Sequence, residues 1–480
     1  MLKQRVVSAS LWSLLDVLGR QGLTFVTTYV LARLLTPEDF GAVALLAVIA
    51  GLAGIFVDGG FSFALIQRQD ATHDDESSVF WINILIACVL FGLLLSTAPL
   101  IARFLGMPTL ELLMLPFAAT IVVGAASSVH VALLTKKLAF RTLGIVNALA
   151  AGFAGLLAIA MAALGYGIWA LAAQAIATSV VTTVALWGLH AWRPHAVIKW
   201  DSIRRLFAFG SFMFLSTLLD KVTYGLQSTL IGKLYGPRDL GLYSRAESML
   251  NFPLSMVAGL VNRVAFPLFA SIADDRDRML RGVRKAVRIA MFVNAPMMLG
   301  LAATSDLTIH VLLGNQWNGA APILAVMCLT GLIWPLHIIT LSVLSGLGRS
   351  DLCFRIEVFK KAITIPLLLV ASQFGVMWFA WTQVLMVGSA VGVTLAVSYK
   401  LLGYSCRDVV SDCRGPVLAA GCMAAGVWCL GVSVDAGPLL KWLVLVSFGG
   451  ALYAAIASVC RVRAFAESLE LLRLHRSTGV

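Results

Sequence analysis

Ionisable side chains occur inside several long apolar segments of this 480-residue chain. In the first segment Asp16 and Arg20 are four residues apart, so on a helix they share one face and can pair with each other. In a later segment Asp220 and Lys221 are adjacent, and on a helix they point about 100° apart. An ionisable group in hydrocarbon is costly unless it is paired or hydrated. These four residues are therefore candidates for binding a charged substrate or an ion.

Asp58, in the second apolar segment, is a candidate for ion coupling. It lies 18 residues into that segment and Asp16 lies 18 residues from the outer end of the first, so on helices both are about 27 Å from the same membrane face. Two neighbouring carboxylates can share one proton, and such a pair would suit a coupling H+ or Na+. The alternative interpretation is that Asp58, which is followed by Gly59 and Gly60, caps a bend in its helix.

Glu247 and Arg263 stand near the start and the end of a later apolar segment. We expect Glu247 to face an internal lumen, and Arg263 either to snorkel toward the membrane surface or to contact a substrate. The isolated histidines His130, His310 and His337 are interpreted as hydrogen-bonded packing residues and not as proton relays. The eight cysteines form no CxxC, and the sequence contains no Cys/His cluster with the spacing of a metal site.

The elements that carry these residues must be membrane helices. The chain is 60% hydrophobic and 12% charged, whereas soluble domains carry roughly 25% charged residues. Its apolar runs reach the roughly 20 residues that a helix needs to cross the hydrocarbon, and helices satisfy their own backbone hydrogen bonds in lipid. We therefore predict an all-α polytopic membrane protein with about fourteen spans. They are expected at 8–34, 40–66, 78–102, 110–134, 143–165, 167–190, 206–232, 240–268, 286–313, 320–346, 356–374, 376–401, 416–434 and 438–460.

The basic residues lie mainly in short clusters between the apolar runs. With the N-terminus inside, the cytoplasmic segments hold 27 of the 36 Lys and Arg residues and the outer loops hold 6. This asymmetry predicts that both termini are cytoplasmic, since an even number of spans returns the chain to its starting side. A formal charge of +12 that is spread in this way favours topology signals over a nucleic-acid interface.

A repeat with an offset of 200 residues predicts two pseudo-symmetric lobes of six helices each. The segments ARLLTPEDFG (32–41) and GKLYGPRDLG (232–241) share Leu, Pro, Asp and Gly at matching positions. Each is a helix stop and restart, in which Thr36 or Gly236 caps the next helix and proline begins it. Duplicated lobes around a midplane site are typical of alternating-access transporters. The expected parts are an N-terminal lobe (1–190), an interfacial linker (191–205), a C-terminal lobe (206–401), two further helices (402–460) and a cytoplasmic tail (461–480).

Three motifs resemble those of a known transporter family. They are the turn LLTPEDFG (34–41), the run DGGFSFALIQRQ (58–69) and the turn LYGPRDLGLYSRAE (234–247). Together with the plan of six, six and two helices, they are similar to the polysaccharide flippases of the MOP (multidrug/oligosaccharidyl-lipid/polysaccharide) superfamily, which includes the MATE transporters. Within it, the chain resembles the Wzx-like branch that exports units of the colanic acid and xanthan kind. The resemblance covers roughly residues 1–460.

This resemblance implies a function and a cargo. The chain would carry an undecaprenyl-pyrophosphate-linked oligosaccharide across the bacterial inner membrane by alternating access, for exopolysaccharide or O-antigen synthesis. Membrane lipid, a polysaccharide polymerase and a chain-length regulator are the implied partners. If the first and seventh helices face the cavity, as the resemblance implies, Arg20 and Lys221 can contact the pyrophosphate, with Arg263 as a third cation and Asp16 and Asp220 holding the cations in place.

Two other transporters of the superfamily remain alternatives. A lipid II flippase would also have fourteen helices and a basic cavity, whereas a multidrug or cation antiporter would usually have twelve helices and an acidic cavity. An enzyme is disfavoured, because the sequence contains no nucleotide-binding P-loop and no H-E-x-x-H motif. Its predicted turns, of at most about 17 residues, are also too short for a catalytic domain. No cofactor is predicted besides the coupling ion.

Overall fold

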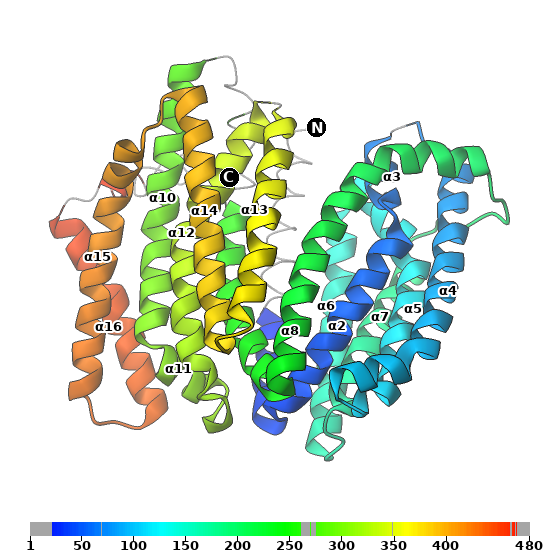
Figure 1. Ribbon diagram of the computed structural model, residues 1–480, viewed down its shortest axis with the longest axis horizontal. Helices are drawn as coiled ribbons and strands as arrows, with labels where there is room; N and C mark the ends of the chain where they lie inside the picture. The colour runs from blue at the N-terminus through cyan, green and yellow to red at the C-terminus, as the bar shows by residue number, and fades with distance from the viewer. Residues whose placement is uncertain are drawn as a thin grey trace. The chain divides into compact units, whose positions relative to one another are not determined.

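The computed structural model describes residues 22–68, 70–260, 269, 275–347, 349–460, 463–465 and 467. Within these residues the regular elements are helices, joined by turns (Figure 1). The chain divides into two compact units, Met1–Gly241 and Leu242–Val480. The division falls directly after the second copy of the repeated motif. The lobe boundaries were derived from the symmetry of the repeat, whereas this division is based on compactness. The predicted lobe boundaries therefore stay a prediction.

The first unit contains seven helices and the first part of an eighth among its described residues. An apolar helix at Gly22–Leu34 comes first. It is followed by α2 (Pro37–Asp58), α3 (Phe61–Gln67), α4 (His73–Leu105), α5 (Thr109–Lys136), α6 (Phe140–Ala163), α7 (Trp169–Leu189) and the first part of α8 (Trp200–Leu260). Residues 190–199 form an irregular linker that lies along the start of α4, where the backbone N–H of Lys199 donates to the Ser78 hydroxyl at 2.9 Å.

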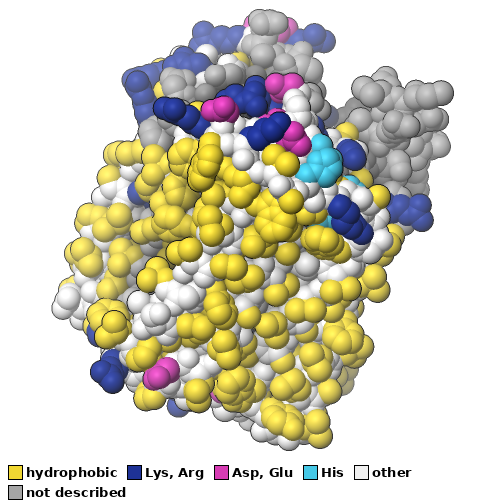
Figure 2. All heavy atoms as spheres, turned by 90° about the vertical axis from the view of Figure 1, so that its right-hand side faces the viewer, with side chains coloured by type: hydrophobic (Ala, Val, Ile, Leu, Met, Phe, Trp, Pro, Cys, Tyr) yellow, Lys and Arg dark blue, Asp and Glu magenta, His cyan; other side chains and the backbone are white. Residues whose placement is uncertain are grey.

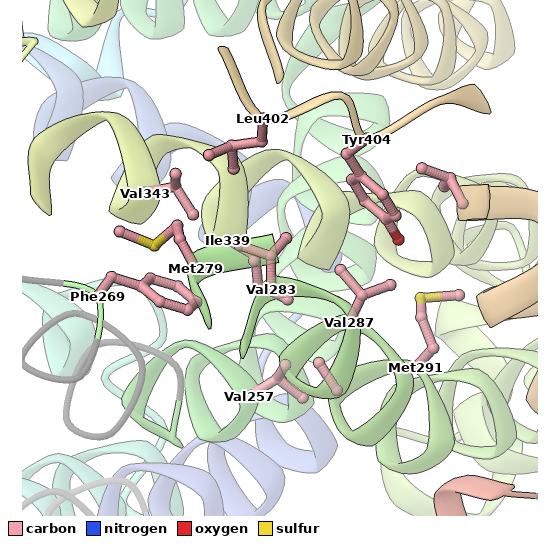
Figure 3. Packing of buried hydrophobic residues seen from close by; sticks show 12 residues of the cluster. Val257, Phe269, Met279, Val283, Val287, Met291, Ile339, Val343, Leu402 and Tyr404 are labelled. Atoms are coloured by element: carbon pink, nitrogen blue, oxygen red, sulfur yellow. The ribbon is translucent and has the colours of Figure 1, made fainter. Parts of the chain in front are cut away.

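The second unit contains the rest of α8 and eight further described elements. They are α10 (Arg276–Ala303), α11 (Ser305–Leu312), the short 3-10 helix η2 (Asn315–Trp317), α12 (Ala320–Gly346), α13 (Ser350–Ala371), α14 (Val376–Leu402), α15 (Cys406–Ser433) and α16 (Pro438–Val459). Helix α10 packs against α12 and α15, and α12 packs against α14 (Figure 1). Figure 3 shows how side chains of α8, α10 and α12, such as Val257, Val283 and Ile339, meet Leu402 and Tyr404 in one buried cluster.

Ten helices of the described residues are long and apolar enough to cross a membrane, or eleven if the bent pair within 200–259 forms one span. Large hydrophobic side chains face outward on them, as on α4, where Leu85, Val89 and Leu93 are each more than half exposed and recur every four residues. On the face shown in Figure 2, hydrophobic side chains cover the middle, and most charged side chains gather toward one end. A soluble protein would not expose an apolar surface of this extent. The chain is therefore a multi-pass, all-α membrane protein.

The predicted segments fall mainly on helix wherever the structure describes them. Residues 8–21 of the first span and 261–268 of the eighth lie outside the described residues. Among the described residues, two predicted spans are each divided into two helices, so the prediction of one continuous helix was wrong for both. The segment 40–66 breaks between α2 and α3, and 286–313 breaks at Thr304 between α10 and α11. The physical cause of the first break lies in Gly59 and Gly60, whose φ angles of 53° and 80° are accessible to glycine at little cost.

The predicted stop and restart of the helix occurs in both copies of the repeat. In the first copy the Thr36 hydroxyl accepts from the backbone N–H of Asp39 at 3.3 Å, and the Asp39 carboxylate accepts from the backbone N–H of Thr36 at 3.0 Å. This reciprocal capping box begins α2, with Pro37 in its first turn. In the second copy Gly236 interrupts the helical backbone of α8 with a φ of 90° and a ψ of 173°. The second restart has no capping side chain at that position, because glycine lacks one.

Candidate functional site

The repeated motif brings α2 and α8 into close contact within the first unit. A Cβ atom on Gly41 would overlap the backbone carbonyl of Pro237, and a Cβ atom on Gly241 would overlap that of Pro37. The contact is reciprocal, so each copy of the motif supplies one proline carbonyl and one glycine surface. Packing of α2 against α8 therefore explains why both copies of the motif contain this proline and glycine, which the sequence did not reveal.

A second reciprocal contact lies at the other end of the same helix pair. Gly60, at the break after α2, and Gly210, on α8, approach so closely that a Cβ atom on either would overlap the other's backbone. Between the two contacts, Gly225 of α8 lies against Val48 of α2. Helix α2 and the first part of α8 are thus packed antiparallel along their whole length, with small residues at both ends.

Asp58 caps the restart of the helix after the Gly59–Gly60 break. Its carboxylate accepts from the backbone N–H of Ser62 at 3.3 Å and also from the Ser62 hydroxyl. The structure thus shows the capping alternative of the sequence analysis. Asp16, the predicted partner of Asp58 in an acidic pair, lies outside the described residues. Ion coupling through Asp58 stays a prediction.

A cavity of about 170 Å³ lies between Asp58 and α8. It is lined by residues of α2, α3 and the break between them, and on the α8 side by Met213, Phe214 and Thr217. Lys221 follows Thr217 by four residues, so it lies on the same stripe of α8 one turn farther along. Lys221 is exposed and forms no ion pair with the described part of the chain. The structure therefore leaves one predicted phosphate contact accessible, on the helix that borders the Asp58 cavity.

The other predicted site residues are only partly placed. Asp220 is exposed on α8 beside Lys221. Glu247 is half-buried in the second unit, where its carboxylate accepts from the Gln383 side chain of α14 at 3.4 Å. Arg20 and Arg263, like Asp16, lie outside the described residues. Of the three predicted cations, the described part of the chain therefore contains Lys221 alone.

A cluster in the second unit was missed by the sequence analysis. The ammonium of Lys360 donates to the Glu357 carboxylate at 2.8 Å and lies 3.2 Å from Nε2 of His337. His337 is therefore not isolated, and its burial and its contact with Lys360 are those of a hydrogen-bonded packing residue, as predicted. His130, in contrast, is packed among Trp187, Trp192 and other aromatic rings, with no hydrogen-bond partner in the described structure.

The sequence held a partial signal for this cluster. Glu357 and Lys360 are three residues apart on α13, which places them on one helix face. His337 belongs to α12, so its contact with them depends on how the two helices pack. His337 and Lys360 expose only 7% and 13% of their side chains, which makes this a buried polar group inside the second unit.

A larger cavity of about 650 Å³ lies near the start of α8 in the first unit. Phe56, Phe61, Phe207 and Phe214 give it an aromatic wall, and Trp200, Asp201 and Arg204 give it a polar edge. Ile82 and Ile86 of α4 are among its remaining lining residues. An aromatic wall with a charged edge is suited to an amphiphilic molecule, since each part finds a matching surface.

These features define the class of the protein before any relative is considered. It is a multi-pass helical membrane protein in which helices that carry ionisable groups are packed closely through glycines. A solved structure of the lipid II flippase MurJ in an inward closed conformation has this fold, with a TM-score of 0.77, 14% sequence identity, and coverage of 94% of this chain and 98% of that chain.

The family follows from the sequence comparison. Residues 30–322 match the model of the family described as polysaccharide biosynthesis protein, and the chain belongs to this family. The succinoglycan biosynthesis transport protein ExoT of Rhizobium meliloti is 30% identical over 72% of this chain and 69% of its own length. The lipopolysaccharide biosynthesis protein WzxC of Escherichia coli is 27% identical over 82% of this chain and 78% of its own length.

Proposed function

We propose that this protein is a flippase that moves a lipid-linked oligosaccharide across the bacterial inner membrane by alternating access. The observation that carries the proposal is membership of the polysaccharide biosynthesis family in a chain whose fold matches a lipid II flippase over nearly its whole length. The relatives named for succinoglycan transport and lipopolysaccharide biosynthesis support an exopolysaccharide or O-antigen unit as the cargo. Both termini would be cytoplasmic, as the distribution of basic residues predicts.

The cargo would be held by cations. Its undecaprenyl pyrophosphate is anionic, so we assign Arg20 and Lys221 as pyrophosphate contacts and Arg263 as a third, with Asp16 and Asp220 as their charge partners. Exposure of Lys221 on α8 supports this assignment. The finer identity, a Wzx-like exporter of the colanic acid and xanthan kind that works beside a polymerase and a chain-length regulator, rests on the resemblance of the motifs. A coupling H+ or Na+ would drive the cycle.

The assignment is tested by replacing both cations. The double variant Arg20→Gln/Lys221→Gln should lose at least about tenfold in polysaccharide export, because each charge-assisted hydrogen bond to phosphate contributes about 1.5–3 kcal/mol. Lys400→Gln, which removes an exposed cation at the end of α14, is the matched control and should export normally. Export is measured in a strain that lacks the native gene, with the amount of membrane-inserted protein determined in parallel. Full export from a normally inserted double variant would refute the cation assignment.

A lipid II flippase is the second candidate, because a MurJ structure shares this fold. The two functions predict different consequences of gene loss. Cells without their lipid II flippase should lyse, whereas cells without an exopolysaccharide flippase should grow and lose surface polysaccharide. Lysis on depletion of this protein, with rescue by another lipid II flippase, would overturn the proposed function.

A further inference from the structure

A network of ion pairs within the second unit shares no residue with the groups described above. Asp412 of α15 exposes only 4% of its side chain and accepts from Arg284 at 2.9 Å and from Arg288 at 3.0 Å, both of α10. The hydroxyl of Tyr404 donates to the same carboxylate at 3.2 Å. Arg288 also donates to Glu467 at 2.6 Å. Charge-assisted hydrogen bonds of this kind fix the orientation of the Arg288 guanidinium.

A cavity of about 370 Å³ opens beside this network. Its volume lies within the roughly 300–1,000 Å³ that is typical of small-molecule sites. The charged residues of its lining are Arg288, Asp412, Arg414 and Arg463, and Ser411 adds a hydroxyl. Arg414 and Arg463 are exposed, and neither forms an ion pair with any residue that the structure describes.

The charge of the lining favours an anion. Three arginines face one carboxylate, so the lining carries an excess of two positive charges. The carboxylate of Asp412 is already occupied by donors from Arg284, Arg288 and Tyr404. Arg414 and Arg463 therefore keep their donors for a ligand, and guanidinium groups bind phosphate oxygens in a bidentate manner.

The rest of the lining favours a ligand with an apolar chain. Leu418 follows Arg414 by four residues and Cys422 follows Leu418 by four, so the three lie on one stripe of α15. Leu418 is 67% exposed, and Ile456 of α16 is also part of the lining. The stripe starts at the charged beginning of α15 and continues into the apolar part of its span. A free phosphate ion would leave this stripe uncovered, whereas an acyl chain would cover it.

We propose that the cavity between α10, α15 and α16 binds an anionic phospholipid of the surrounding membrane. Its phosphate lies between Arg414 and Arg463, beside Arg288, whose donors are held by Asp412 and Glu467. One acyl chain lies along Leu418 and Ile456. Basic pockets between membrane helices are a known mode of binding for anionic lipid headgroups. The site shares no residue with the cations assigned to the transported lipid, so it does not depend on the proposed function.

The experiment is native mass spectrometry of the full-length protein purified in detergent. Phosphatidylglycerol, phosphatidylethanolamine, undecaprenyl phosphate and inorganic phosphate are each added at equal concentration. The variant Arg414→Gln/Arg463→Gln is compared with Arg355→Gln/Lys400→Gln, which removes two exposed cations of α13 and α14 outside the cavity lining. Equal melting temperatures of the variants establish that folding is unchanged.

The expected result is retention of phosphatidylglycerol by the wild type and by the control, with at least about tenfold weaker retention by Arg414→Gln/Arg463→Gln. Leu418→Asn should also weaken retention, because it interrupts the apolar stripe while leaving the arginines in place. Equal retention by Arg414→Gln/Arg463→Gln and the control would overturn the site. Displacement of the lipid by inorganic phosphate, or preferential binding of phosphatidylethanolamine or undecaprenyl phosphate in the cavity, would overturn the assigned ligand class.

Discussion

At the scale of single residues, an ionisable group inside a membrane protein can be structural or functional, and its partners decide between these roles. Asp58 accepts two hydrogen bonds from Ser62 and so begins α3 after the glycine break. Lys221 has no such partner in the described structure and stays available to a ligand. The Lys360 ammonium, with Glu357 and His337, is satisfied within the second unit. The position of these groups in hydrophobic segments does not by itself distinguish a structural role from a functional one.

Substitution of Asp58 separates capping from ion coupling. Asp58→Asn keeps an acceptor oxygen for the backbone N–H of Ser62, so we expect near-normal stability and export if the role is capping. Asp58→Ala should lower the free energy of unfolding by about 1 kcal/mol, because the N–H at the start of α3 loses its partner. Thermal unfolding in detergent and polysaccharide export measure the two effects. Complete loss of export by a stable Asp58→Asn protein would instead establish a role for its charge.

At the scale of elements, the crossing of α2 and α8 depends on glycines at both ends. The reciprocal contacts Gly41–Pro237 and Gly241–Pro37 place each backbone against the other with no side chain between them. Gly60 and Gly210 repeat the arrangement at the other end. These contacts give the repeated motif a tertiary role beyond its local role of ending and restarting a helix.

Alanine at Gly41 should disrupt this crossing. Its Cβ would overlap the Pro237 carbonyl, and because backbone cannot rotate away as a flexible side chain can, we expect about 1–3 kcal/mol of destabilisation. Gly51→Ala, on the same helix α2, is the matched control, since a Cβ there meets nothing within 4 Å. The melting temperature in detergent should fall for Gly41→Ala and stay constant or rise for Gly51→Ala. Equal melting temperatures of the two variants would show that the close contact of α2 and α8 at Gly41 does not contribute to stability.

At the scale of the whole molecule, the chain is a bilayer-spanning protein whose outer surface is apolar because lipid is its solvent. Its ten to eleven recognisable spans in the described residues fall mainly on the predicted apolar segments. The two compact units divide at Gly241, after the second repeated motif. The orientation in the membrane follows from the basic residues and stays a prediction.

Topology reporters test that orientation. Alkaline phosphatase inserted after Asn318, in the turn before α12, should be active because this turn is predicted to be periplasmic. The same enzyme inserted after Gly403, in the turn between α14 and α15, should be inactive, and a fluorescent protein in its place should fold. The opposite pattern at both positions would show that the chain has the opposite orientation in the membrane from the one predicted.

The sequence by itself determined that the protein spans a membrane, where most spans lie and that a motif repeats after 200 residues. Hydropathy over about 20 residues and the local capping of helices are properties of contiguous sequence, so they need no tertiary information. The bend at Gly59–Gly60 was one of two alternatives that the sequence left open, whereas the break at Thr304 was missed, because a short break barely changes the hydropathy of a segment.

Only the tertiary structure decided which charged and small residues meet. Gly41 faces Pro237, and Arg288 pairs with a carboxylate 179 residues away in the sequence, because helices far apart along the chain pack side by side. The cavity that Arg288 shares with Arg414 and Arg463 arises in the same way, from three segments that no local pattern connects. Burial in such packing leaves some ionisable groups satisfied and others open to a ligand, and that difference is set by neighbours in space rather than in sequence.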